Sequence, residues 1–141
     1  MRKIALDVGD VRIGIATSDP MGIIAGGYET YTRTKSINHD MKYLASLIKE
    51  KQCDTIIIGL PINMDGTYGE RVDIVKTFAE KLQQFTLTPI VFYDERLSTI
   101  SAEKSLIQSG MRREKRKKVI DKVAATIILQ GYLDKMNKRS Y

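Results

Sequence analysis

Residues 55–59 form an unbroken apolar run, Thr-Ile-Ile-Ile-Gly, within a chain of 141 residues. A strand with one solvated face alternates polar and apolar side chains, so an unbroken run indicates a strand that is covered on both faces. Residues 89–93 repeat this pattern, and the segment between the two runs has apolar residues at helical spacing. Two such strands joined by a helix predict a right-handed parallel crossover. The chain is therefore expected to fold as an α/β protein.

The other patterns place three strands before this crossover and two helices after it. Gly9 and Asp10 form a tight turn between the first two strands, and Ser36 suits the N-cap of a helix that follows the third. The predicted order βββαβαβαα corresponds to a mixed five-stranded sheet with helices on both faces, in one domain spanning residues 1–141. Strands are predicted over residues 4–8, 11–18, 26–34, 55–59 and 89–93, and helices after Ser36, within 72–82, and over 99–109 and 114–134.

The composition excludes several classes of protein and of site. With 43% hydrophobic and 28% charged residues, the chain has the composition of a globular protein, neither disordered nor fibrous. It has one cysteine, Cys53, and one histidine, His39, too few for a structural zinc site. No apolar run is long enough to cross a bilayer, and Asp7 interrupts the start where a signal peptide needs apolar residues. We expect a cytoplasmic protein without a membrane partner.

Positive charge is concentrated in the last third of the chain. Residues 96–141 hold 12 Lys and Arg but 4 Asp and Glu, and the net charge of the whole chain is +6. Such a cluster is an electrostatic footprint for a phosphate backbone or an anionic lipid. It is also what the solvated start of a helix looks like, and charge alone leaves both interpretations open. The candidate nucleic-acid-binding residues of this stretch are Arg112, Arg113, Lys115, Arg116, Lys117 and Lys118.

Three carboxylates stand where a carboxylate is costly. Asp7 lies inside an apolar strand, Glu95 comes directly after the apolar strand 89–93, and Asp121 has apolar helical neighbours at i+3, i+4 and i+7. Each has an ordinary explanation: hydrogen bonding to a turn, proximity to a helix N-terminus, or a place on the rim of the helix. Together they indicate a site, because the predicted fold brings all three to one edge of the sheet.

Crowded carboxylates repel one another unless cations neutralise them. Oxygen ligands suit Mg²⁺ or Mn²⁺, and one or two such ions can activate water for phosphodiester cleavage. Asp7, Glu95 and Asp121 are therefore predicted as metal ligands and catalytic residues of a divalent-metal-dependent nuclease. The basic stretch would hold its polyanionic substrate.

Four segments resemble the motifs of a known family. They are residues 7–16 (DVGDVRIGIA), 59–66 (GLPINMDG), 94–99 (DERLST) and 121–130 (DKVAATIILQ). Their order and content resemble the bacterial YqgF proteins, which have an RNase H-like fold. The resemblance implies a cytoplasmic nuclease for the 5′ end of pre-16S rRNA in ribosome biogenesis, although the same family has also been called Holliday junction resolvases.

The resemblance also suggests roles for particular residues. Asp7, Glu95 and Asp121 match the acids to which the family's metal binding is ascribed, and the positions of Arg12 and Arg96 suggest that they hold phosphate. A salt bridge to a neighbouring carboxylate is an equal interpretation for both arginines. Residues 63–66 could form a substrate-edge loop or only the turn that starts the next helix, and we favour the turn.

Three alternatives to an rRNA nuclease remain. The first is a Holliday junction resolvase acting on four-way DNA, which requires a symmetric dimer for paired cuts. The second is a non-catalytic RNA-binding ribosome-assembly or transcription factor, in which the carboxylates would be dispensable. The third is a nucleotide-binding phosphotransferase related to actin-like ATPases, which need two such domains and so fit 141 residues poorly. Structured RNA is the favoured partner and a DNA junction the possible one; monomer and homodimer both remain open.

Overall fold

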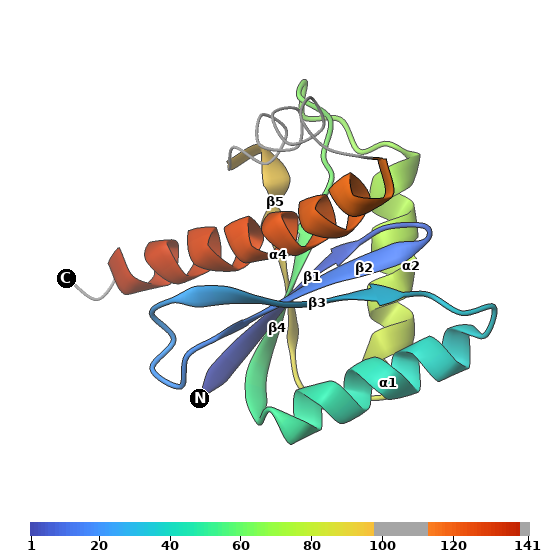
Figure 1. The fold of residues 1–141 in the computed structure, drawn as a ribbon. Coiled ribbons are helices and arrows are strands. Elements are labelled where there is room, and N and C mark those ends of the chain that lie inside the picture. The colour runs from blue at the N-terminus through green and yellow to red at the C-terminus, as the bar shows by residue number, and fades with distance from the viewer. Residues whose placement is uncertain (98–112, 139–141) are drawn as a thin grey trace.

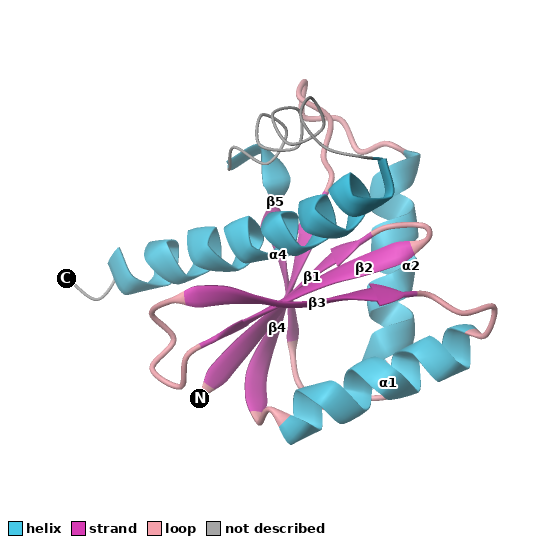
Figure 2. Ribbon diagram, in the orientation of Figure 1, coloured by secondary structure: helices cyan, strands magenta, loops and turns pink. Residues whose placement is uncertain are grey.

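The chain folds around a mixed five-stranded sheet with β1 at its centre (Figures 1 and 2). The computed structural model describes residues 1–97 and 113–138. The strand order is β3-β2-β1-β4-β5; the first three strands are antiparallel, and β4 and β5 run parallel to β1. The predicted meander followed by parallel crossovers is confirmed. The strands are β1 (Arg2–Val8), β2 (Arg12–Ser18), β3 (Ala25–Thr32), β4 (Cys53–Leu60) and β5 (Ile90–Asp94).

Helices cover both faces of this sheet. In Figure 1, α4 crosses one face, and α1 and α2 lie on the other side. The helices are α1 (Ile37–Glu50), α2 (Glu70–Gln83), the short 3-10 helix η1 (Glu95–Leu97) and α4 (Arg113–Lys138). No helix in the described parts of the chain is long and apolar enough to span a membrane.

The apolar run in β4 divides between two cores. Ile56 and Ile58 belong to the core under α1 and α2, whereas Ile57 belongs to the core under α4. Alternate side chains of a strand point to opposite faces, so a strand covered on both faces must be apolar throughout. The core under α4 contains small residues such as Ala5 and Ala124, which let this helix lie close to the sheet. Close approach of α4 is what positions the candidate site.

Some element boundaries differ from the predictions. β3 ends at Thr32 rather than residue 34, because the amide of Thr34 donates a 3.0 Å hydrogen bond to the carboxylate of Asp40 instead of continuing the strand. β4 begins at Cys53, two residues before the predicted start. Burial raises the pKa of the Cys53 thiol to about 11, which makes this cysteine unreactive. α4 extends four residues beyond the predicted 114–134. The predicted helix 99–109 lies outside the described residues.

Candidate functional site

Asp7 is a buried carboxylate on the central strand. It is 8% exposed and lies two positions after Ala5, which packs in the core under α4. The period of a strand therefore directs Asp7 to the α4 face, whereas Leu6 and Val8 enter the opposite core. The sequence placed this carboxylate correctly in an apolar strand, and the structure identifies the face it occupies.

Gly14 brings Asp121 next to Asp7. Gly14 in β2 is the cross-strand partner of Asp7, so the two Cα atoms are direct neighbours in the sheet. A Cβ atom at Gly14 would overlap with the carbonyl group of Asp121 and lie 3.1 Å from its Cα. The backbone of α4 thus rests on β2 at the position beside Asp7, and only glycine leaves room for it.

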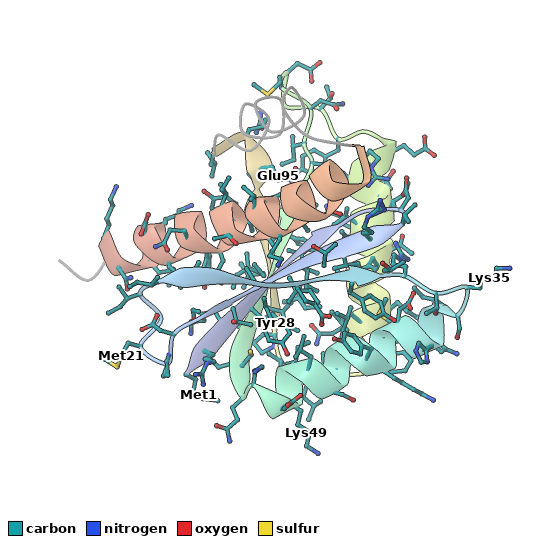
Figure 3. The ribbon with its side chains drawn as sticks, viewed as in Figure 1. Met1, Met21, Tyr28, Lys35, Lys49 and Glu95 are labelled. Carbon is teal, nitrogen blue, oxygen red and sulfur yellow. The ribbon has the colours of Figure 1, made fainter. Side chains whose placement is uncertain are left out.

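On the other side of β1, Gly59 leaves room for the side chain of Glu95. Leu6 pairs with Ile58, so Gly59 in β4 stands level with Asp7. A Cβ atom at Gly59 would lie 2.7 Å from Oε1 of Glu95 and 2.5 Å from the side chain of Ile128 in α4. Figure 3 shows Glu95 near α4, at the end of β5. The side chain of Glu95 therefore occupies the space above Gly59.

Asp121 and Glu95 consequently flank Asp7 along one short row of the sheet, Gly14–Asp7–Gly59, on the face under α4. This row is a cradle that two Cβ atoms would fill, and the acids around it offer only oxygen ligands, which suit Mg²⁺ or Mn²⁺. Within the described residues, no three His, Cys, Asp or Glu side chains are already grouped to hold a metal ion. The fold thus brings the acids to one place without closing them around a common point.

Arg12 contributes to this open arrangement. Its Nε lies 3.9 Å from Oδ2 of Asp121, and both side chains are largely buried. The Nε atom is buried and has no hydrogen-bond partner in the described structure. Arg12 therefore provides a positive charge beside Asp121, and its Nε is not committed to a hydrogen bond in the described structure.

Arg96 lies at the neighbouring strand end and is bound by Asp94. Its Nη2 donates a 2.8 Å hydrogen bond to Oδ2 of Asp94, and its Nε and backbone amide donate to the same carboxylate. The side-chain hydrogen bonds from Arg96 lower the pKa of Asp94 and raise the pKa of Arg96. Both arginines thus have a carboxylate neighbour, the salt-bridge arrangement considered from the sequence, and their binding of phosphate stays a prediction.

Residues 63–66 form a turn next to Arg96. The amide of Gly66 donates to the carbonyl of Asn63 at 2.8 Å, and Gly66 has a φ of +87°, which favours glycine. A Cβ atom at Gly66 would lie 3.5 Å from Nη1 of Arg96. The predicted turn is present, but α2 begins four residues after it, at Glu70, and a role at the substrate edge stays a prediction.

Most of the basic stretch begins α4. Residues 113–118 form its first turns and precede Asp121 on the same helix, and Arg112 lies outside the described residues. With a rise of about 1.5 Å per residue, Lys118 is about 5 Å along the helix axis from Asp121. The stretch is thus adjacent to the candidate site.

Comparison with known proteins identifies the family. A family model described as "RuvX: Holliday junction resolvase" matches residues 1–135. The chain belongs to the RuvX family. RuvX and YqgF are two names of one family, so the resemblance to the YqgF proteins that the four motifs indicated is confirmed.

Curated RuvX relatives are similar over nearly their whole length. A protein of Desulforamulus reducens is 52% identical over 134 residues, covering 95% of this chain and 97% of the relative. A protein of Halalkalibacterium halodurans is 49% identical over 136 residues, covering 96% and 97%. Both are named "Putative pre-16S rRNA nuclease".

Two structures of Thermus thermophilus RuvC share the fold. Their TM-scores are 0.60 and 0.59 at 10% and 9% identity, and each match covers 97% of this chain. The matches cover 96% and 97% of the RuvC chains, and the first of these structures is a complex with a Holliday junction substrate. The likeness establishes the RNase H-like fold that the motifs implied.

Proposed function

We propose that this RuvX protein is a divalent-metal-dependent nuclease that hydrolyses phosphodiester bonds at the 5′ end of pre-16S rRNA. The observation that carries the proposal is the cradle around Asp7, where Gly14 and Gly59 admit Asp121 and Glu95 to the same face of the sheet. Two relatives that are 52% and 49% identical are named as nucleases of this RNA, and these names support the choice of substrate. Acting on this RNA would place the protein in the cytoplasm.

In this proposal Asp7, Glu95 and Asp121 hold Mg²⁺ or Mn²⁺. When bound, one or two such ions supply an activated water and stabilise the charge that develops on phosphodiester oxygens. Arg12 lies 3.9 Å from Asp121 and would turn toward a substrate phosphate once the carboxylate has another partner. The basic residues before Asp121 would hold the RNA backbone through charge.

The decisive test is exchange of each acid for its amide. Asp7→Asn, Glu95→Gln and Asp121→Asn should each lower kcat for Mn²⁺-dependent cleavage of precursor rRNA by about 100-fold or more. Affinity for the RNA should change little, and the losses should not add, because residues acting as one unit fail together. Asp73→Asn is the matched control, since Asp73 is exposed on α2, in the layer opposite α4.

Wild-type turnover in any one amide variant would remove that residue from the centre. Wild-type turnover in all three would place the catalytic centre on other residues. No Mn²⁺-dependent cleavage by the wild-type protein, with RNA binding retained, would favour a non-catalytic RNA-binding assembly or transcription factor.

A second candidate is resolution of four-way DNA junctions. The description of the matching family favours it, and this activity requires paired cuts by a symmetric dimer. One assay separates the candidates if it offers precursor rRNA, unstructured RNA and a four-way DNA junction to the same enzyme with Mg²⁺ or Mn²⁺. Preferential cleavage of the junction would replace the rRNA proposal.

A further inference from the structure

We propose that Arg33 is a positioning residue for the candidate centre, holding the turn between Asp7 and Arg12 from the face opposite α4. This inference rests on the proposed function, because it assigns Arg33 a role in shaping that centre. Arg33 follows β3 and is outside the four family-like motifs. Its side chain reaches the turn that joins β1 to β2.

Arg33 holds this turn at two points. Its Nη1 donates a 2.8 Å hydrogen bond to the carbonyl of Gly9, and its backbone amide donates a 2.9 Å bond to the carbonyl of Val11. The turn is closed by the amide of Gly9, which donates to the carbonyl of Arg12 at 2.9 Å. Val8 and Arg12 stand at the two ends of this turn, so its geometry sets the direction of the Arg12 side chain and holds the strand end that carries Asp7.

Arg71 of α2 holds the same turn from a second element. Its Nη1 donates a 2.7 Å hydrogen bond to Oδ1 of Asp10, and its Nη2 donates to the carbonyl of Val8 at 3.4 Å. Each residue from Val8 to Val11 is thus contacted by one of the two arginines. One backbone hydrogen bond closes this turn, and three further hydrogen bonds from arginine side chains hold it in place.

Arg33 itself lies beside a buried carboxylate, whose Oδ2 has no hydrogen-bond partner in the described structure. Its Nε lies 3.9 Å from Oδ2 of Asp40, which is 1% exposed, and its guanidinium lies 5.4 Å from the ring centroid of Phe78. Oδ1 of Asp40 accepts hydrogen bonds of 2.7 Å from the hydroxyl of Tyr31 and 3.0 Å from the amide of Thr34. Both α1 and α2 therefore constrain the guanidinium.

The pair formed by Arg33 and Asp40 orients the guanidinium more than it stabilises the fold. Burial opposes ionisation of Asp40, but hydrogen bonds from Thr34 and Tyr31 and the charge of Arg33 outweigh it and hold its pKa below the usual value. Buried ion pairs contribute little net stability compared with apolar residues of similar size. They do fix an orientation, and here the fixed group is the one that binds the carbonyl of Gly9.

The test compares Arg33→Met with Lys3→Met in the full chain. Lys3 pairs with Asp54 at 2.6 Å near the opposite end of β1, so its loss removes a more exposed ion pair away from the turn. Arg33→Met should weaken Mn²⁺ binding, measured from the EPR signal of free ion, by about 10-fold, as for loss of a group that orients metal ligands. Lys3→Met should leave Mn²⁺ affinity unchanged.

Two further readouts separate positioning from substrate contact and from general instability. Arg33→Met should lower kcat with little change in KM, because Arg33 lies on the α1 and α2 side, away from the face that carries the acids. Amide hydrogens of residues 9–12 should exchange faster. Arg33→Lys keeps a donor for the carbonyl of Gly9 and should restore part of the Mn²⁺ affinity.

Wild-type Mn²⁺ affinity and wild-type exchange in Arg33→Met would overturn the inference, as would an equal loss in Lys3→Met. If Arg33→Met does not fold, Arg71→Met gives the same comparison from the 45% exposed partner arginine. If the wild-type protein binds no Mn²⁺, the proposed metal centre fails, and the exchange of residues 9–12 still decides whether Arg33 holds the turn.

Discussion

At the scale of single residues, the candidate site depends on two glycines, because the absence of a side chain leaves room for the acids. Gly14 and Gly59 flank Asp7 in the sheet, and each gives space to a different acid. Glycine in a strand weakens the strand, so its presence at two positions level with one buried carboxylate needs a cause. The cause is the close approach of α4 at Asp121 and of Glu95 after β5.

Gly14→Ala should therefore destabilise the protein. The added methyl group overlaps with the backbone of Asp121, and backbone cannot move without displacing α4. We expect a loss of about 1–3 kcal/mol in the free energy of unfolding, measured by urea denaturation, and weaker Mn²⁺ binding. Gly26→Ala is the control, because a Cβ atom there meets nothing nearer than 4.0 Å. Equal stability of the two variants would mean that α4 does not press on β2.

The sequence predicted the acids but not what surrounds them. Asp7 stands out because an aspartate interrupts an apolar strand, whereas Gly14 carries no signal until the helix above it is known. Asp40 resembles an ordinary acid in the first turn of a helix, and its burial beside Arg33 depends on how α1 packs. Contacts between elements distant in sequence are what local patterns cannot express.

At the scale of elements, hydrophobic patterns predicted the strands and helices better than they predicted contacts between single residues. Unbroken apolar runs predicted strands covered on both faces, and β4 indeed divides its side chains between two cores. The boundaries moved where side chains compete with the backbone, as Asp40 does at Thr34 after β3. The predicted helix over 114–134 lies within α4, since its charged stretch precedes an apolar pattern.

Reversing charge at the start of α4 tests whether this element binds nucleic acid. Replacing Arg113, Arg116 and Lys117 by Glu should weaken RNA binding at every sequence. If about three phosphates are contacted, the slope of log K against log salt should fall by roughly 2–3 units, because fewer counterions are released. Fluorescence anisotropy between low and moderate salt gives the slope.

The matched control is reversal of three exposed lysines associated with α1, which changes the net charge equally on the other side of the sheet. Those lysines are Lys35, Lys42 and Lys49. A similar fall in slope for both sets would indicate attraction by net charge alone, and no fall for the α4 set would leave the stretch as a solvated helix start.

At the scale of the whole molecule, the proposed centre can form only when the chain is folded. Its acids come from the first strand, the end of the last strand and the final helix, so they are separated by most of the sequence. The unfolded chain holds them far apart and cannot present them to one ion. If the three acids bind a metal ion as proposed, that binding is coupled to global stability, which gives a test that needs no substrate.

Saturating Mn²⁺ should raise the stability of the wild-type protein by about 2.7 kcal/mol when its concentration is 100 times the Kd. Asp7→Asn removes one ligand and one of three mutually repelling charges from a buried position. The variant should be as stable as wild type or more stable without ion, and should lose most of the Mn²⁺ effect. Thermal unfolding with and without Mn²⁺ measures both changes. A variant that melts lower without ion yet keeps the full Mn²⁺ shift would make Asp7 a structural residue, because a ligand cannot be removed without weakening the binding that it provides.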